Sequence, residues 1–251
     1  TFKVQAEIVK AYRTFLDGEH FTEFQSPKLT GDDAEGGANV FSVPYFYGKT
    51  AHLGTSPQFY KQIMVGIFER VYTIGNVFRA EKHSTTRHLN EYTSMDVEMG
   101  FINDHHDIME LEIRLMRHLI EHLRTTCSEE FKLLDAAFPT ISEIVPTMKL
   151  REAQELIFKE TGVDKHNEPD LDPEDERWLC DWAKREKGSD FVFVTHYPVD
   201  KRPMYTLEDL NDPGYTKSFD LLFRGVEITT GGQRRHDYDN LIEGIKMKGL
   251  D

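Results

Sequence analysis

Residues 78–93, FRAEKHSTTRHLNEYT, bring cations, carboxylates and an aromatic side chain together without pairing a nucleophile with a base. An arginine such as Arg79 is a forked, permanently charged donor that suits phosphate. The ring of Tyr92 could stack on a base, and the carboxylate of Glu81 could accept a hydrogen bond from an exocyclic amine. The stretch therefore predicts a nucleotide site. The alternative is a solvated hairpin whose surface ion pairs are each worth ~0–1 kcal/mol.

A second set of polar side chains lies in FDLLFRGVEITTGGQRRHD, residues 219–237. Its carboxylates and hydroxyl are hard oxygens of the kind that Mg²⁺ prefers, and they belong to Asp220, Glu227 and Thr230. We expect one bent strand with a break at Gly225. The glycine pair 231–232 would let a ligand approach the backbone closely, and Arg234 follows it. An ordinary edge strand with a glycine turn explains the same residues equally well.

A third candidate is SPQFYK, residues 56–61, where Gln58 and Lys61 share one face of an expected helix. Lys61 is either a solvated helix residue, the commoner case, or an ammonium directed at an anionic group. No GxGxxG or GxxxxGK[ST] loop is present, so any phosphate must be held mainly by side chains. No HExxH or GxSxG motif occurs either, which argues against a catalytic transition metal and a serine nucleophile.

Hydrophobic periodicity indicates the elements that must position these residues. Expected helices cover 4–16, 57–68, 105–124, 149–160 and 173–187, and a glycine turn followed by a helix closes the chain. Expected strands cover 21–27, 40–47, 50–54, 71–81, 90–101, 191–198, 203–207 and 218–230. The strands 71–81 and 90–101 would form an antiparallel hairpin joined by the charged loop 82–89. This alternation predicts an α+β fold, a mixed and mainly antiparallel sheet flanked by helices, in one domain over 1–251 with a peripheral or inserted region at about 125–200.

The composition is that of a folded, acidic protein. The chain has 251 residues with 39% hydrophobic residues, so a core can form, and its formal net charge of −14 argues against nucleic-acid binding by bulk electrostatics. Only Cys127 and Cys180 occur, without CxxC spacing, which favours a reducing cytoplasm. No apolar run approaches the ~20 residues of a membrane span. The chain begins with Thr1, so we expect it to be a piece of something longer.

These blocks together resemble the class II aminoacyl-tRNA synthetases, most closely the aspartyl-tRNA synthetases of the archaeal and eukaryotic type. HFTEFQSPKL resembles their motif 1, FRAEKHSTTRHLNEYTSMDVEMGF their motif 2, and AEGG the loop that closes over the amino acid. SPQFYK is similar to the aspartate-binding segment, and FRGVEITTGGQRRHDY to the strand before motif 3. The resemblance covers essentially the whole chain and is weakest over 125–200. Motif 3 and the N-terminal anticodon-binding barrel would lie outside these 251 residues.

The resemblance implies a ligase that activates aspartate with ATP and transfers it to the 3′ end of tRNA, with Mg²⁺, as a cytoplasmic homodimer. The implied ATP-binding residues are Arg79, Glu81, Arg87, His88, Leu89, Tyr92 and Glu227. The implied aspartate-binding residues are Glu35, Gln58, Lys61, Arg79, Asp96, Thr230 and Arg234. The implied metal ligands are Asp220, Glu227 and Thr230. Arg79 and Glu227 would be catalytic, and Pro27 would lie at the dimer interface.

The sequence also bears on which amino acid is activated. Two cations, Lys61 and Arg234, suit the side-chain carboxylate of aspartate, whereas neutral asparagine would leave cationic charge uncompensated. One departure from the family pattern is Thr55, where a glutamine usually precedes Ser-Pro-Gln. Three alternatives remain open. They are a paralogue that makes free asparagine, an asparaginyl-tRNA synthetase, and a non-catalytic synthetase-like module for binding or dimerisation.

Overall fold

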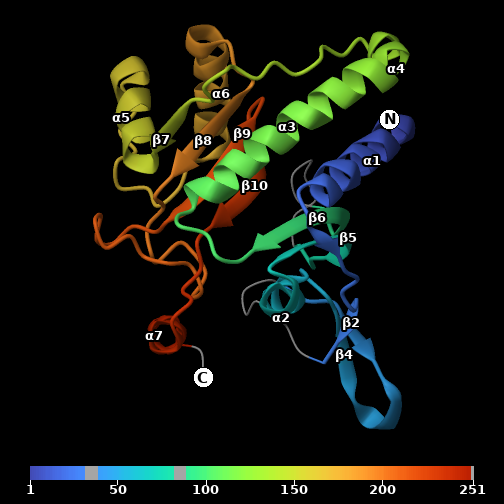
Figure 1. Ribbon diagram of the computed structural model, residues 1–251. Coiled ribbons are helices and arrows are strands. Elements are labelled where there is room, and N and C mark those ends of the chain that lie inside the picture. Colours follow the sequence, from blue (N-terminus) through green and yellow to red (C-terminus); the bar gives the residue numbers. More distant parts are fainter. Residues whose placement is uncertain (32–38, 82–88, 250–251) are drawn as a thin grey trace. The chain divides into compact units, whose positions relative to one another are not determined.

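A computed structural model of the chain describes residues 1–31, 39–81 and 89–249. The chain divides into a larger unit, Thr1–Ala11 with Asn103–Asp251, and a smaller unit, Tyr12–Ile102. Helix α1 (Phe2–Gly18) begins in the first of these and ends in the second (Figure 1). Within the described ranges, no helix combines the length and apolar character needed to cross a bilayer. The prediction of a single domain over 1–251 stays a prediction.

The smaller unit contains two three-stranded sheets, the end of α1 and a further helix. One sheet has the order β1-β5-β6, formed by β1 (Thr22–Glu23), β5 (Arg70–Phe78) and β6 (Glu91–Met99). The other has the order β2-β4-β3, formed by β2 (Leu29–Thr30), β4 (Thr50–Leu53) and β3 (Ser42–Pro44). The short 3₁₀ turn η1 (Phe46–Gly48) joins β3 to β4, as the lone Gly48 predicts, and helix α2 (Gln58–Phe68) follows. Of the predicted strand over 21–27, only Thr22–Glu23 is paired.

The predicted antiparallel hairpin is confirmed, with Val77 opposite Tyr92 and Thr73 opposite Asp96. The predicted strand over 71–81 would place Arg79 and Glu81 on one face, and this is wrong because β5 ends at Phe78. The amide of Arg79 still donates to the carbonyl of Asn90 at 2.9 Å, and the amide of Glu81 donates back to the carbonyl of Arg79 at 2.8 Å. This tight turn ends the alternation of side chains two residues before Glu81.

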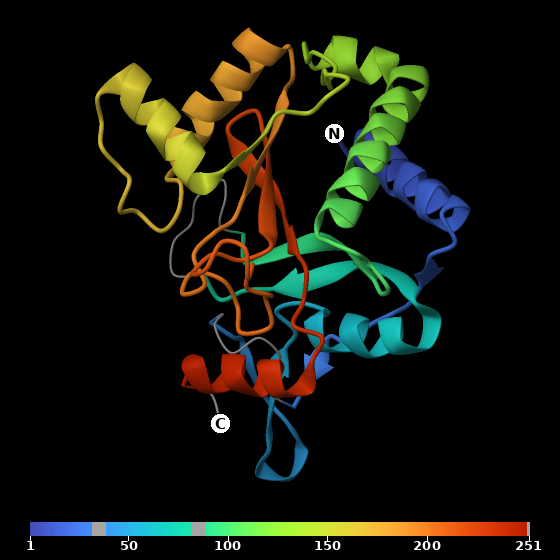
Figure 2. The same cartoon turned by 60° about the vertical axis from the view of Figure 1, so that its left-hand side comes forward.

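The larger unit is built on a four-stranded sheet of order β10-β9-β8-β7. Its strands are β7 (Thr147–Lys149), β8 (Phe191–Thr195), β9 (Ser218–Phe223) and β10 (Val226–Gly232). Alternation along β8 gives the sheet two apolar faces. Val192 and Val194 pack with α5 (Leu150–Thr161) and α6 (Pro173–Lys187), the helices predicted over 149–160 and 173–187. Phe191 and Phe193 pack on the other face with α3 (His106–Thr126), which α4 (Ser128–Leu133) follows (Figure 2).

The segment 218–232 is a hairpin, and the predicted single bent strand is wrong. Arg224 (φ 49°) and Gly225 (φ 84°) form its two-residue turn, and Val226 pairs with Phe223. Two consecutive left-handed residues suit a tight hairpin because their twist matches that of the strands. The predicted glycine turn at 231–232 is also wrong. Both residues lie within β10, and a Cβ at Gly231 would come within 2.3 Å of the ring of Phe219.

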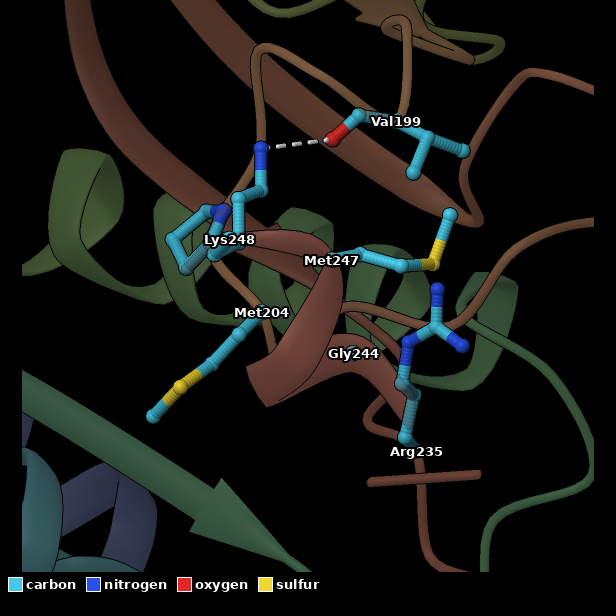
Figure 3. Close-up of a pocket in the computed structure, with 7 residues that line it drawn as sticks. Val199, Met204, Arg235, Gly244, Met247 and Lys248 are labelled. Carbon is cyan, nitrogen blue, oxygen red and sulfur yellow. Dashed lines mark hydrogen bonds between the residues drawn. The ribbon is translucent and has the colours of Figure 1, made fainter. Parts of the chain in front are cut away.

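The closing helix, α7 (Tyr238–Met247), is confirmed, and it packs against an irregular segment rather than a strand. The strand predicted over 203–207 is absent; Thr206 makes a single bridge to Arg234. Figure 3 shows how α7 meets this segment around a cavity of about 10 Å³. The ammonium of Lys248 donates to the carbonyls of Val199 at 3.2 Å and Asp200 at 2.7 Å.

Gly244 is the point of closest approach between α7 and its support. A Cβ on Gly244 would lie 2.4 Å from the carbonyl oxygen of Met204 and 3.2 Å from Nε of Arg235. Because a backbone carbonyl cannot rotate away as a side chain can, Gly244→Ala is expected to lower the free energy of unfolding by about 1–3 kcal/mol. Urea denaturation measures this. Gly18→Ala is the matched control, since nothing lies within 4 Å of its added Cβ; equal effects of both changes would contradict the prediction.

A buried imidazole lies at the start of α3. His105 is 1% exposed, and its ring centroid is 4.1 Å from that of His106 and 5.6 Å from that of His196. The carboxylate of Asp104 and the imidazoles of His105 and His106 lie close enough together to hold a metal ion. The ammonium of Lys217 already donates to Asp104 at 3.0 Å, however, so this carboxylate has a cationic partner. Burial lowers the pKa of His105 to about 4, and the two neighbouring imidazoles add to this while Asp104 opposes it.

Acid should therefore weaken the folded state through His105. Between the ordinary histidine pKa of 6.5 and the folded-state pKa of about 4, the unfolded chain binds a proton that the folded chain excludes. The free energy of unfolding is expected to fall as pH drops through this window and to lose no more from this group below it. His105→Gln should flatten the slope, whereas His106→Gln, at an exposed ring, should not. Urea titrations at pH 7, 6, 5 and 4 would test this, and identical slopes in wild type and His105→Gln would contradict it.

Candidate functional site

The smaller unit holds a cation and a carboxylate in contact on the face of the hairpin. Lys61 projects from the first turn of α2, and its ammonium donates to Oδ1 of Asp96 on β6 at 3.0 Å. Both side chains are about 15% exposed, and Ser94 donates to the other oxygen of Asp96. Gln58, one helical turn before Lys61 in α2, is buried. The structure thus brings three predicted aspartate-binding residues to one place.

Arg79 lies at the end of the hairpin, beside its predicted partner. Its guanidinium carbon is 5.9 Å from the ring centroid of Tyr92, and its Nε lies 3.5 Å from the carbonyl of Thr55. Both contacts are long, so its partners among the described residues leave guanidinium donors for an anion. Glu81 is half-buried, and Leu89 is exposed. Three further predicted residues, Glu35, Arg87 and His88, lie outside the described residues, and Pro27 is exposed between β1 and β2.

The predicted metal ligands in the larger unit share one face of the β9–β10 hairpin because of a β-bulge. Residues 227 and 230 differ by an odd number, so a regular strand would place them on opposite faces. The register shifts between Glu227 and Thr229, and Thr230 then faces Asp220 directly. As a result the hydroxyl of Thr230 donates to Oε1 of Glu227. Bulges redirect side chains in this way next to functional sites.

Asp220 differs from the other two because it is buried and already bound. It is 3% exposed, and Arg202 donates to its Oδ1 at 2.7 Å and to Ser218 at 3.1 Å. The guanidinium of Arg202 also lies 3.8 Å from the ring centroid of Tyr197. The pKa of Asp220 is raised to about 6, mainly by burial. The charge of Arg202 opposes this rise, and the charge of Glu227 adds to it.

These oxygens fit a divalent cation by their chemistry. Glu227 and Thr230 are exposed and offer hard ligands, and a cation beside Glu227 would also relieve its repulsion of Asp220. Asp220 is less suited to the ion, because both Arg202 and the hydroxyl of Tyr197 already form hydrogen bonds with its carboxylate. Arg234, which follows β10, lies with its guanidinium carbon 4.6 Å from the ring centroid of Tyr205.

Sequence reasoning missed three charged residues that support these groups. Arg202 lies just before the segment 203–207, which was predicted to be a strand, and no motif includes it. Glu112 interrupts the apolar face of α3 and is 7% exposed. Its pKa is raised to about 7, mainly by burial; the hydrogen bond with Thr229 opposes this rise, and the charge of Asp220 adds to it. A carboxylate between Leu111 and Leu115 was the signal that could have found Glu112. The third residue, Lys28, directly follows Pro27, and nothing in the sequence distinguishes it.

The comparisons with known proteins agree on one family. The model of the family described as tRNA synthetases class II (D, K and N) matches residues 1–251. An aspartate–tRNA(Asp/Asn) ligase of Deinococcus radiodurans is 52% identical over 97% of this chain and 57% of its own length. That of Thermus thermophilus is 49% identical over 99% and 58%.

A similar solved structure belongs to a synthetase for asparagine, whereas the relatives above are described as ligases for aspartate. The asparaginyl-tRNA synthetase of Pyrococcus horikoshii, complexed with asparaginyl-adenylate, superposes with a TM-score of 0.90 at 30% identity, over 100% of this chain and 57% of that one. The chain thus spans a little over half the length of the curated relatives it matches. The α+β fold predicted from the sequence is confirmed. With the family model matching from the first residue to the last, the chain belongs to the class II tRNA synthetases of the D, K and N group.

Proposed function

We propose that this chain is the core of an aspartate–tRNA ligase, which joins L-aspartate to ATP as aspartyl-adenylate and passes the aspartyl group to the 3′ end of tRNA. The proposal rests on the contact between Lys61 and Asp96, two opposite charges held together on one sheet face. Such a pair can exchange its internal contact for the carboxylate and ammonium of a charged amino acid. The relatives described as aspartate–tRNA ligases, at 37–52% identity, support this substrate.

The first step asks little proton chemistry of the protein. The α-carboxylate of aspartate is ionised at neutral pH, so it attacks the α-phosphorus of ATP without a general base, and pyrophosphate leaves. The protein's task is to align the two groups and to stabilise the negative charge that develops on the phosphate oxygens. Arg79 is assigned to the α-phosphate and the substrate carboxylate, Tyr92 to stacking on adenine and Glu81 to its amine. Leu89 completes the base pocket, and Arg87 and His88 are assigned to the outer phosphates.

The amino acid is held by charge. Lys61 and Arg234 are assigned to the carboxylates of aspartate, Asp96 to its ammonium and Gln58 to positioning, with Glu35 closing over it. Bound Mg²⁺ would supply positive charge at the phosphates. Glu227 and Thr230 would hold the metal ion, with Asp220 behind them, and Thr230 would also face the substrate. Glu227 is therefore counted with Arg79 as catalytic.

Aspartate-dependent exchange of pyrophosphate with ATP, measured on the full-length protein, tests the proposal. We expect exchange with aspartate and little with asparagine. Exchange with asparagine alone would replace the proposal by the asparaginyl enzyme, which the Pyrococcus structure favours as second candidate. Free asparagine as the product would identify an aspartate-activating paralogue. The absence of both exchange and ATP–Mg²⁺ binding in calorimetry would identify a non-catalytic module.

The remaining assignments concern the assembled protein. We propose a cytoplasmic homodimer whose interface includes Pro27, with the acceptor end of tRNA as a further partner. A relative described as the cytoplasmic aspartate–tRNA ligase of Caenorhabditis elegans, 37% identical over 100% of this chain, supports the location. Sedimentation equilibrium of the full-length protein, compared with a Pro27→Glu variant, measures the dimer.

A further inference from the structure

A second lysine ammonium lies on the sheet face that carries the Lys61–Asp96 pair. Lys28 stands between β1 and β2, and its half-buried ammonium donates to the hydroxyl of Ser26 at 2.9 Å. Its backbone is fixed as well, since the amide of Gly54 donates to the Lys28 carbonyl at 2.9 Å. Burial lowers the pKa of Lys28, and the charge of Asp96 raises it in part, so the two groups sense each other.

Gly75 explains how the ammonium reaches this position. The residue lies inside β5, where glycine weakens a strand unless something must approach the backbone closely. The approaching group is Lys28. A Cβ on Gly75 would lie 2.9 Å from Nζ of Lys28 and 3.1 Å from its Cε. No left-handed φ requires glycine here. The missing side chain is therefore the space that the ammonium occupies.

The strand register places this space beside Asp96. Gly75 pairs with Ser94, and Thr73 pairs with Asp96, two residues further along the same face. Side chains at i and i+2 of a strand point to one side of the sheet, so the ammonium seated over Gly75 lies on the side of Ser94 and Asp96. The carboxylate of Asp96 thus has the ammonium of Lys61 at 3.0 Å and also senses the charge of Lys28 on the same sheet face.

We propose that Lys28 is a positioning residue of the aspartate pocket, which compensates the charge of Asp96 and keeps it in place when the substrate carboxylate draws Lys61 away. This rests on the proposed function of Lys61 and Asp96. Without Lys28, the ammonium of Lys61 would be the main counter-charge of Asp96, and binding a substrate carboxylate would compete with that contact. With Lys28, Asp96 remains compensated and can receive the substrate ammonium.

The test is aspartate- and ATP-dependent pyrophosphate exchange on the full-length protein with two variants that remove the ammonium in different ways. Lys28→Met deletes its charge, and Gly75→Ala keeps the charge but fills its seat. Each is expected to raise the KM for aspartate about tenfold or more while leaving the KM for ATP within about twofold. Because both variants remove one effect, the double variant should be no worse than the more severe single variant.

Two control variants show whether a change in the KM for aspartate is specific to Lys28 and Gly75. Lys49→Met removes an exposed lysine of the same unit, and Gly66→Ala adds a Cβ with nothing within 4 Å; neither should change the KM for aspartate. An unchanged KM for aspartate in Lys28→Met, or an equal rise in both KM values, overturns the role of Lys28. If Gly75→Ala does not fold, Lys28→Met decides alone. Loss of aspartate-dependent exchange in the wild type would instead overturn the proposed function.

Discussion

Replacing Arg79 with alanine is expected to lower the kcat of aspartate-dependent pyrophosphate exchange by about 10²–10³-fold. The reaction has no general base to lose, so the guanidinium that stabilises charge on the α-phosphate contributes most to the rate. Arg79 is suited to this because its contacts in the protein, 5.9 Å to the ring of Tyr92 and 3.5 Å from Nε to the carbonyl of Thr55, leave donors for phosphate. Arg79→Lys should recover only part of the rate, since a point charge cannot reproduce bidentate geometry.

The control for this prediction is an arginine at the other end of the same strand. Arg70 also has long contacts, 3.3 Å to the carbonyl of Glu19 and 5.6 Å to the ring of Phe21. Arg70→Ala should leave kcat unchanged and shift the melting temperature by about as much as Arg79→Ala does. Stopped-flow measurement of adenylate formation gives the rate directly. A kcat for Arg79→Ala within tenfold of wild type would remove Arg79 from the mechanism.

Replacing Lys61 with methionine should change which amino acid is accepted. The side chain of Lys61 is 16% exposed and its ammonium contacts Asp96, so its removal deletes a largely desolvated charge from the pocket. We expect kcat/KM for aspartate to fall by roughly 10²-fold or more, as truncation of one buried charge partner does. Neutral asparagine does not need the cation, so its kcat/KM should fall much less, and the preference for aspartate should shrink accordingly.

Steady-state exchange with each amino acid over a range of concentrations measures this preference. Lys49→Met, at an exposed lysine, serves as control and should leave both values unchanged. An equal loss for aspartate and asparagine would show that Lys61 supports the pocket without reading the side-chain charge. A Lys61→Met, Asp96→Asn double variant would then separate the pair's structural contribution from its contact with substrate.

The elements were predictable wherever the hydrophobic period was long. The stripe Ile108, Leu111 and Leu115 predicted α3 within two residues of its bounds, and the alternation along 71–101 predicted the β5–β6 hairpin. Failures occurred where one local feature decides the outcome. Arg224 takes a left-handed φ that arginine rarely adopts, so the Arg-Gly turn was read as a break within one strand. Gly231 and Gly232 were read as a turn, although both lie within β10, where Phe219 packs over Gly231 and the backbone of Lys217 approaches Gly232.

The sequence by itself determined the family, the α+β class and the set of charged residues proposed to bind ATP and aspartate. Hydrophobic periodicity and the order of motifs are properties of the linear sequence, so both can be recognised without the structure. Only the tertiary structure decided how those charges are paired. The bulge between Glu227 and Thr229 puts two residues of odd spacing on one face. Arg202 holds Asp220 from 18 residues away, and Lys28 takes the space over Gly75 from the segment between β1 and β2. Such pairings depend on strand register and close packing between distant segments, which no short stretch of sequence specifies.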